Sequence, residues 1–284
     1  AEEVAFAQES LRLSGGMAAA LVSAETLADR FAESGPRLTV AQKAERDRSW
    51  AFGHVVVDEA QELSPMAWRL LMRRCPSRSM TVVGDMAQTS AAAGASSWEE
   101  VLAPYAEGRW RQVELTVNYR TPATVMALAA GMLKAAGIGV QPPESAREGE
   151  LPQAIRLSAG DKAALAAQVA RAFADLGERR MAVIAPEAGL WAAAGLAEAL
   201  QAALPPEALG LAESALDAPV ALLTPRQSKG LEVDVVVLVE PADILEASSR
   251  GAGDLYVALT RATQRLLIAH ARPLPAGMEG VEEG

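Results

Sequence analysis

The sequence predicts an α/β fold in which parallel sheets are flanked by helices. Two short β-branched runs, His54–Val57 and Met80–Val83, each lead into a carboxylate and are separated by a helix-like segment, Ser64–Arg74. Such strands are typical of open parallel sheets, which place polar groups at the carboxyl ends of their strands. Further along the chain, strand-like and helix-like segments alternate, as in a sheet with right-handed crossovers.

The first part of the chain is predicted to hold several elements besides this strand–helix–strand unit. Residues 1–52 have the pattern of helices broken at Ser14–Gly16 and Ser34–Pro36. The elements that follow residue 88 are, in order, a loop of small residues over Thr89–Ser97, a short helix near Trp98, a strand over Gln112–Thr116, and a helix from Pro122 to about Ala136 with Thr121 as its N-cap.

The second part begins after Gly137–Pro152, which is rich in glycine, proline and charge and is predicted to be a linker or surface loop. The predicted strands cover Ala154–Leu157, Met181–Ala185, Val220–Leu223, Val233–Val239 and Arg265–Ala269. The predicted helices cover Asp161–Leu176, Glu187–Leu204 and Asp254–Ala262.

Composition limits the classes of protein that this chain can belong to. Its 284 residues allow one large or two ordinary domains, and 50% hydrophobic residues allow a substantial core. The net charge of −10 means that any contact with nucleic acid must be local. A single cysteine, Cys75, excludes an internal disulfide and suits a reducing cytosol, so we expect a cytoplasmic protein. No apolar run approaches the ~18 residues of a membrane span.

The carboxylates that follow the first two strands indicate a nucleotide and magnesium site. Phosphoryl transfer from ATP requires magnesium, a positioned water and cations near the γ-phosphate. Asp58 is placed to hold the metal, and Glu59 to polarise the water. Acidic pairs are also common at helix N-termini, because the helix dipole favours them. The repetition of the pattern at Gly84–Asp85, with Gln88 just beyond, favours the nucleotide site.

Three later segments add candidate residues. In Asn118–Pro122, Tyr119 could stack on a base and Arg120 could reach a phosphate, although an ordinary surface pair has the same sequence. Thr224–Asp234 could bind phosphate or ribose, or form a polar turn. Arg261 stands late in an apolar helix, where it could serve chemistry or only satisfy the last carbonyl groups of the helix.

Taken in chain order, these segments resemble the motifs of superfamily 1 helicases and translocases of the UvrD/Rep type. VVVDEAQ (55–61) is similar to motif II, VVGDMAQ (82–88) to motif III, ELTVNYRTP (114–122) to motif IV, TPRQSKGLEVD (224–234) to motif V and YVALTRATQRL (256–266) to motif VI. The resemblance spans about residues 54–270. It implies a RecA-like P-loop NTPase fold. In that fold the helical segment 1–52 leads into an incomplete first motor domain (53–116), and a complete second motor domain (117–284) follows.

The resemblance also implies a role for each matching residue. Asp58 would bind Mg²⁺, Glu59 would be the general base, and Gln61 and Gln88 would couple the γ-phosphate to movement along a strand of nucleic acid. The implied contacts of the other residues are Tyr119 with adenine, Arg120 and Arg261 with the γ-phosphate as arginine fingers, Glu232 with ribose, and Thr224, Arg226, Lys229 and Gly230 with nucleic acid.

The sequence departs from the family pattern in ways that matter for function. It contains no G-x-x-x-x-G-K-[ST] loop, so we expect that this chain alone does not hydrolyse ATP and is the C-terminal part of a longer motor. The segment after Gln88 is small and polar where the family usually carries aromatic residues, each of which stacks on a base for roughly 1–3 kcal/mol. Arg226 stands where many members have histidine.

The short spacing between motifs IV and V, together with GDMAQTS and SSWEEVL, is most similar to the HelD branch, which acts on RNA polymerase. We therefore expect the rear part of a HelD-like motor that uses ATP and Mg²⁺. Its expected partners are DNA, in single-stranded form, and RNA polymerase, and the sequence gives no oligomeric state. Two alternatives stay open: a DNA-unwinding repair helicase of the UvrD/Rep type, and a non-enzymatic interaction module that has lost its P-loop.

Overall fold

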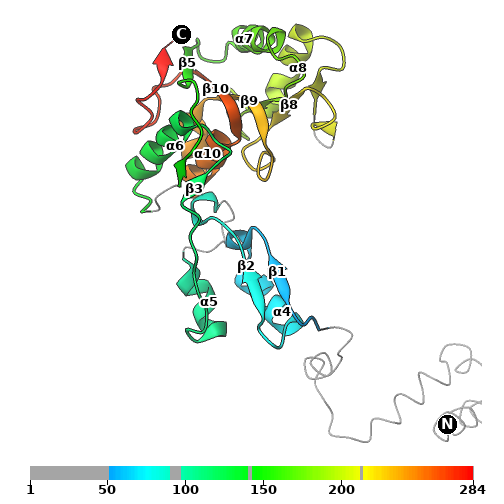
Figure 1. Ribbon diagram of the computed structural model, residues 1–284. Coiled ribbons are helices and arrows are strands. Elements are labelled where there is room, and N and C mark those ends of the chain that lie inside the picture. Colours follow the sequence, from blue (N-terminus) through cyan, green and yellow to red (C-terminus); the bar gives the residue numbers. More distant parts are fainter. Residues whose placement is uncertain (1–50, 90–96, 140–142, 212–213, 284) are drawn as a thin grey trace, which may run out of the picture. The chain divides into compact units, whose positions relative to one another are not determined.

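The computed structural model describes residues 51–89, 97–139, 143–211 and 214–283 (Figure 1). The chain forms two compact units, one of Ala1–Val55 with Leu71–Ser79 and the other of Val56–Leu70 with Met80–Gly284. The helices predicted over residues 1–50, and most of the loop predicted over Thr89–Ser97, lie outside the described residues. The division into 1–52, 53–116 and 117–284 stays a prediction.

The described part of the first unit is held together by a turn after a helix. Phe52 N donates a hydrogen bond of 2.7 Å to Arg74 O, and the Arg74 guanidinium lies 4.6 Å from the centre of the Phe52 ring. Val55 N donates to Ser79 O at 3.1 Å. Cys75 is buried, and its Sγ donates to the same carbonyl at 3.3 Å.

The predicted strand–helix–strand unit is present. Strands β1 (Val55–Val57) and β2 (Met80–Val82) form a two-stranded sheet, and α4 (Pro65–Arg74) connects them. Each strand leads into a short 3₁₀-helix, η2 (Ala60–Glu62) after β1 and η3 (Met86–Gln88) after β2. The sequence therefore places two polar turns one after the other at the ends of adjacent strands.

A seven-stranded parallel sheet dominates the second unit, in the order β11-β5-β10-β9-β6-β8-β7. This confirms the predicted α/β class with parallel sheets. The strands are β5 (Gln153–Arg156), β6 (Met181–Ile184), β7 (Leu209–Gly210), β8 (Val220–Leu223), β9 (Val233–Val239), β10 (Ala262–His270) and β11 (Glu282–Glu283). Beyond this sheet, β3 (Val117–Asn118) pairs in parallel with β4 (Glu144–Ser145).

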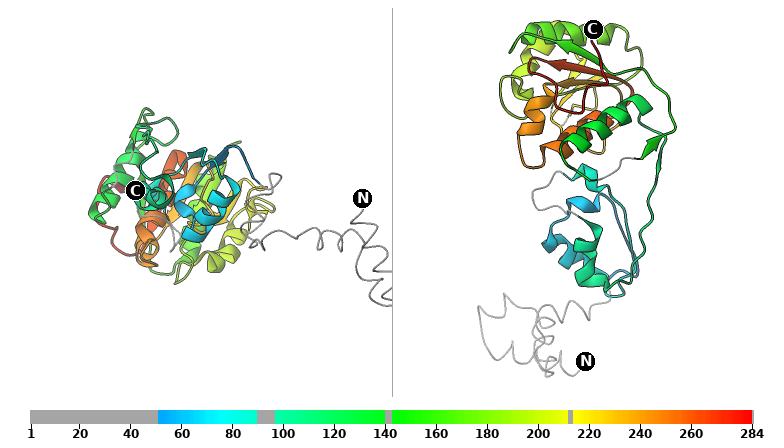
Figure 2. Two further views of the ribbon diagram at one scale, coloured as in Figure 1. Left: turned by 90° about the horizontal axis from the view of Figure 1, so that it is seen from below. Right: turned by 90° about the vertical axis from the view of Figure 1, so that its left-hand side faces the viewer.

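Helices cover both faces of the seven-stranded sheet. Helices α6 (Ala123–Ala135) and α10 (Gly251–Thr260) lie on one face, and helices α7 (Lys162–Ala174) and α8 (Ala193–Ala203) lie on the other (Figure 2). Two further helices are α5 (Trp98–Ala106) and α9 (Pro241–Glu246). No helix among the described residues has the length and apolarity that a membrane span requires.

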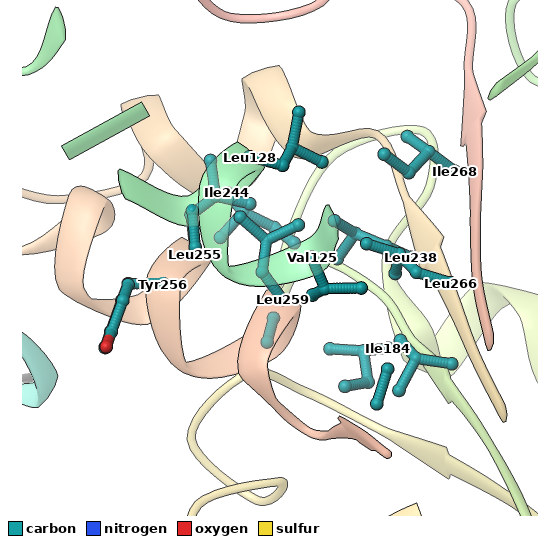
Figure 3. Close-up of a cluster of buried hydrophobic side chains, with 14 of the residues drawn as sticks. Val125, Leu128, Ile184, Leu238, Ile244, Leu255, Tyr256, Leu259, Leu266 and Ile268 are labelled. Atoms are coloured by element: carbon teal, nitrogen blue, oxygen red, sulfur yellow. The ribbon is translucent and has the colours of Figure 1, made fainter. Parts of the chain in front are cut away.

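The central strand β9 is apolar except at Asp234, because helices cover both faces of the sheet. Val236 and Leu238 pack into the cluster under α6 and α10, while Val235, Val237 and Val239 pack into the cluster under α7 and α8. Successive side chains of a strand point to opposite faces, so a strand covered on both faces is apolar along most of its length. Asp234, near the start of β9, is the exception, and its carboxylate accepts hydrogen bonds from Arg180 N and Gln264 Nε2. Figure 3 shows the first cluster, in which the hydroxyl group of Tyr256 points away from the other labelled side chains.

Three details of the predicted secondary structure are wrong. Gln112–Thr116 is not a strand: its side chains are exposed on both sides, with Leu115 84% exposed, and pairing starts only at β3. An alternating pattern gives a strand only where a neighbour supplies hydrogen bonds and a face to bury. The neighbour of β3 is β4, which lies inside the predicted linker Gly137–Pro152.

The other two differences concern helix starts. Thr121 is not the N-cap of α6, since its hydroxyl donates to Thr260 O at 3.3 Å and Pro122 holds the cap position. The helix predicted from Glu187 begins only at Ala193, because the chain turns at Gly189, where φ is +91°. A residue with positive φ cannot continue a right-handed helix.

Candidate functional site

The turn after β1 holds Glu59 in a constrained position. Glu59 is one of the few non-glycine residues with positive φ, at +50°. Its backbone N–H donates to Asp58 Oδ1 at 2.8 Å, and its Oε2 accepts a hydrogen bond of 2.6 Å from Gln61 Nε2. Left-handed backbone at a polar strand end is a strain that proteins commonly keep at functional sites. The Glu59 carboxylate is thus oriented by Gln61, and the Asp58 carboxylate by the backbone of Glu59.

Gln61 links the ends of the two strands. It is fully buried, and its Oε1 accepts a hydrogen bond of 3.1 Å from Asp85 N in the turn after β2. Gly84 makes room for this side chain, because a Cβ at that position would lie 2.2 Å from Gln61 Oε1. The glycine that precedes Asp85 is therefore required by packing, and the two polar turns form one hydrogen-bonded layer.

The turn after β2 then connects to α10. Asp85 accepts hydrogen bonds of 2.9 Å from Ala87 N and from Gln88 Nε2, which fixes the Gln88 amide. The Oε1 of that amide accepts from Arg261 Nη2 at 3.3 Å. Asp85 thereby sets the direction in which Gln88 presents its oxygen to the arginine.

Arg261 is a buried cation fixed by backbone carbonyls. It is only 5% exposed, and its guanidinium donates to Val257 O at 3.0 Å and to Leu231 O at 3.1 Å. Burial lowers its pKa most, the neighbouring charge of Arg120 lowers the pKa further, and Glu59 and Glu232 oppose both effects. The arginine is therefore pre-oriented, and it shares one electrostatic environment with the residues after β1.

Lys229 connects the loop after β8 to both polar turns. Its Nζ donates to Glu62 Oε1 at 2.5 Å and to Gln88 O at 2.8 Å, and it lies 3.7 Å from Glu59 Oε2. The lysine side chain is only 15% exposed, so this ion pair is screened less than a surface pair. The Lys229 ammonium is thus bound by two carboxylates and a carbonyl group of its own chain.

Arg120 and Glu232 form an ion pair of 2.7 Å between the chain before α6 and the chain before β9. Both side chains are about half exposed, so the pair contributes little stability and can open at small cost. The neighbouring Tyr119 is 76% exposed. Exposure leaves its ring accessible for stacking.

The loop 224–230 is shaped by its own hydrogen bonds. Thr224 N donates to Gln227 Oε1 at 2.9 Å, and Gly230 adopts a φ of +74°. Arg226 lies on the surface 3.7 Å from Glu187. Near this loop, burial raises the pKa of Asp254 in α10, and the charge of Arg226 partly opposes that rise.

The structure brings most of the predicted site residues into one network but leaves some outside it. Glu59, Gln61, Gln88, Lys229 and Arg261 are joined by the contacts described above. The Arg120–Glu232 pair adds its charges to the same environment. Tyr119, Arg226 and Gly230 are exposed and Thr224 is half-buried, and within the described residues none of these four has a hydrogen bond or ion pair to the network. Asp58 is exposed and contacts the network only through the hydrogen bond that it accepts from Glu59 N.

Sequence reasoning assigned no role to two acidic residues of the network. Glu62 is the partner of Lys229, and Asp85 orients Gln88. Asp85 had a visible signal, because it ends the second acidic strand as Asp58 ends the first. Glu62 had none, since its partner lies 167 positions away in the sequence.

The carboxylates fit magnesium only together with a phosphate ligand. Mg²⁺ in nucleotide sites takes one or two carboxylates and completes its shell with water and substrate phosphates. Asp58, which directly follows β1, supplies one such carboxylate, and Glu59 beside it is left for the attacking water. No cluster of three or more His, Cys, Asp or Glu side chains suited to a metal occurs in the described ranges.

Comparison with known proteins links part of this chain to helicases. The family model of the viral superfamily 1 RNA helicase core domain matches residues 197–270, which contain Lys229, Glu232 and Arg261. No curated protein matches the sequence. The chain is thus similar to superfamily 1 helicases over this segment, and the match is consistent with the RecA-like fold.

Several solved helicase structures are similar to the chain. The C-terminal domain of a possible DNA helicase from Lactobacillus plantarum WCFS1 is 20% identical, with a TM-score of 0.42, over 58% of this chain and 94% of that one. An arterivirus nonstructural protein 10 (helicase) is 18% identical, with a TM-score of 0.41, over 77% of this chain and 39% of that one. The same kind of protein in complex with DNA is 18% identical, with a TM-score of 0.43, over 79% of this chain and 41% of that one. The chain therefore spans about two fifths of the arterivirus helicases.

Proposed function

We propose that this chain is part of an ATP-driven superfamily 1 motor and that its polar network is the part of the ATPase site that the chain contributes. The observation that carries the proposal is the route from Glu59 through Gln61, Asp85 and Gln88 to Arg261. An acidic strand end and a buried cation, joined through amide side chains, are the groups that hydrolysis of a γ-phosphate requires.

In this proposal each chain residue has a limited task. Glu59, oriented by Gln61, accepts the proton of the attacking water. Arg261 stabilises the charge that develops on the phosphate, and little reorganisation is needed because carbonyl groups already fix its guanidinium. Asp58 would hold Mg²⁺, which would neutralise charge at the phosphates.

The exposed residues are proposed to change their contacts when the nucleotide binds. Arg120 leaves Glu232 and swings toward the phosphate, while Glu232 becomes available for the ribose. Tyr119, whose ring is accessible, stacks on the adenine. The weak ion pair suits this exchange, because little stability is lost when it opens.

Gln88 is the proposed coupling residue. It contacts Arg261 with its side chain and Lys229 with its carbonyl, so a change at the phosphate reaches the loop 224–230 through one residue. We assign nucleic-acid contact to this loop, with Thr224, Arg226 and Gly230 as its accessible positions and Lys229 as the connection inward.

Within the superfamily we propose the HelD branch, with RNA polymerase as partner and DNA as the nucleic acid. Two features of the sequence support this: the short spacing between residues 122 and 224, and the small polar segment after Gln88. Unwinding of a tailed DNA duplex, without co-purification of RNA polymerase, would instead favour a repair helicase of the UvrD/Rep type. If the gene product hydrolyses no ATP, a non-enzymatic interaction module is favoured.

The test is ATP hydrolysis by the complete gene product that contains this chain, with and without single-stranded DNA. Glu59→Gln should lower turnover by at least about 100-fold, the scale of general base catalysis. Glu198→Gln, on the exposed face of α8, is the matched control and should retain the parental rate. Parental turnover in Glu59→Gln would refute the assignment of the base.

A further inference from the structure

A cavity of about 270 Å³ lies beside the start of β10, apart from the network described above. Its lining contains three arginines, Arg147, Arg179 and Arg265, together with two exposed glutamates, Glu148 and Glu150. Cations therefore outnumber anions at this cavity, although the whole chain carries a net charge of −10. A local excess of arginine on an acidic protein needs an explanation.

Arg265, on β10, and Arg179, in the loop between α7 and β6, are held in place by the surrounding structure. Arg265 Nη2 donates to Gln153 Oε1 of β5 at 3.0 Å, and Arg179 Nε donates to Leu176 O at 2.8 Å. Both guanidinium groups are thereby oriented before any ligand arrives, which reduces the entropy that binding costs.

Arg265 has a donor that the described residues leave without an acceptor. Its Nε is buried and makes no hydrogen bond, and the nearest carboxylate oxygen, Glu150 Oε2, is 3.9 Å away on an exposed side chain. A buried N–H without an acceptor destabilises the protein. Arg265 also follows an irregularity in the pairing of β10 with β9, between Ala262 and Arg265. Such irregularities often redirect side chains at binding sites.

The cavity wall also includes the amino end of a helix. Pro122, the N-cap residue of α6, lines the cavity and offers no side-chain cap. The loop that carries Arg147 is fixed to this helix end: Ala123 N donates to Arg147 O at 2.8 Å, and Gly149 contacts Pro122 so closely that a Cβ would lie 2.4 Å from it. Helix amino ends attract anions.

We propose that this cavity is a phosphate-binding site, in which the guanidinium groups of Arg265 and Arg147 donate to the oxygens of one phosphate group and Arg179 adds its charge. Guanidinium groups match phosphate because they donate two parallel hydrogen bonds. The phosphate can come from a small phosphorylated molecule or from the backbone of a nucleic acid. The site does not depend on the motor function proposed above.

The test is titration of the 284-residue chain with inorganic phosphate in a magnesium-free buffer, followed by calorimetry. Arg265→Gln and Arg147→Gln should each weaken phosphate binding by about tenfold or more, as expected for the loss of a charge-assisted hydrogen bond. Arg171→Gln, on the exposed surface of α7, is the matched control and should bind as the parent does. Arg147 lies on an exposed loop, so its variant remains informative if Arg265→Gln fails to fold.

Two further measurements show which kind of molecule supplies the phosphate and at which site it binds. A single-stranded oligothymidylate that competes with phosphate, and loses affinity in the same two variants, assigns the site to a nucleic-acid backbone. An oligonucleotide that does not compete assigns it to small phosphorylated molecules. Absence of phosphate binding by the parent, or equal binding by the parent and both variants, overturns the proposal. So does a loss seen only in Arg120→Gln, because phosphate would then bind at the candidate ATPase site.

Discussion

Arg261 donates a hydrogen bond to the side-chain oxygen of Gln88, a residue 173 positions earlier in the chain. This contact joins the turn after β2 to the end of α10. Because Asp85 fixes the Gln88 amide and two carbonyl groups fix Arg261, neither partner can rotate freely. The acidic strand ends and the buried cation therefore share one rigid connection, which is the physical basis of the proposed ATPase site.

Gly84→Ala should disrupt the layer between the two strand ends. The new Cβ would lie 2.2 Å from Gln61 Oε1 and 2.9 Å from the Trp98 ring, so the buried Gln61 would lose its bond from Asp85. We expect the free energy of unfolding to fall by roughly 1–3 kcal/mol, as for overpacking at a buried site.

Urea denaturation measures this change. Gly53→Ala is the matched control, since a Cβ there would meet nothing within 4 Å. Equal stability of the two variants would mean that Gln61 does not occupy the position described here.

Lys229 and Glu62 should be energetically coupled. Lys229→Met leaves the Glu62 carboxylate without its short ion pair, and Glu62→Gln leaves the largely buried ammonium without its closest counter-charge. Each single change should lower the free energy of unfolding by about 1–3 kcal/mol.

A double-mutant cycle isolates the pair. The double variant should be less destabilised than the sum of the single variants, by about 1 kcal/mol, because both singles remove the same contact. Additive losses would show that the lysine and the glutamate do not interact in solution.

Asp254→Asn should change how stability depends on pH. Burial raises the pKa of Asp254 in the folded chain above its ordinary value of 3.8. The folded state thus binds the proton more tightly than the unfolded state, so the contribution of this carboxyl to stability is fully present below pH 3.8 and is lost as pH rises through the folded pKa. The asparagine variant lacks this fall and should be more stable than the parent at pH 7.

Thermal unfolding of both proteins across this pH range is the measurement. The difference between variant and parent should grow as pH rises and then level off above the folded pKa. A difference that is independent of pH would mean that the Asp254 carboxyl titrates alike in the folded and unfolded states.

The sequence predicted the core strands well, because a strand buried on both faces is a nearly continuous apolar run in the sequence. The run Val233–Val239, apolar except at Asp234, has the same bounds in the structure, and Val220–Leu223 does too. Gln112–Thr116 shows the limit of such patterns. Its alternation is equally clear, but whether it pairs depends on a neighbour that local sequence does not specify.

The candidate site was predictable from the sequence only in part. Glu59, Gln88 and Arg261 stand in recognisable motifs, and the structure places Gln88 in contact with Arg261. Glu62 was not predicted, because its place in the site depends on its ion pair with Lys229, which lies far away in the sequence. Long-range ion pairs form only when tertiary packing brings distant residues together, so the spacing of residues in the sequence does not predict them.

The most direct test of the proposed site is a double-mutant cycle on ATP turnover in the complete gene product, with Glu59→Gln and Arg261→Lys. Residues that act on the same phosphate are strongly non-additive in catalysis. We predict that the double variant is no slower than the slower of the two single variants. Losses that multiply, with all three variants folded, would show that Glu59 and Arg261 act at separate places and would contradict the proposed site.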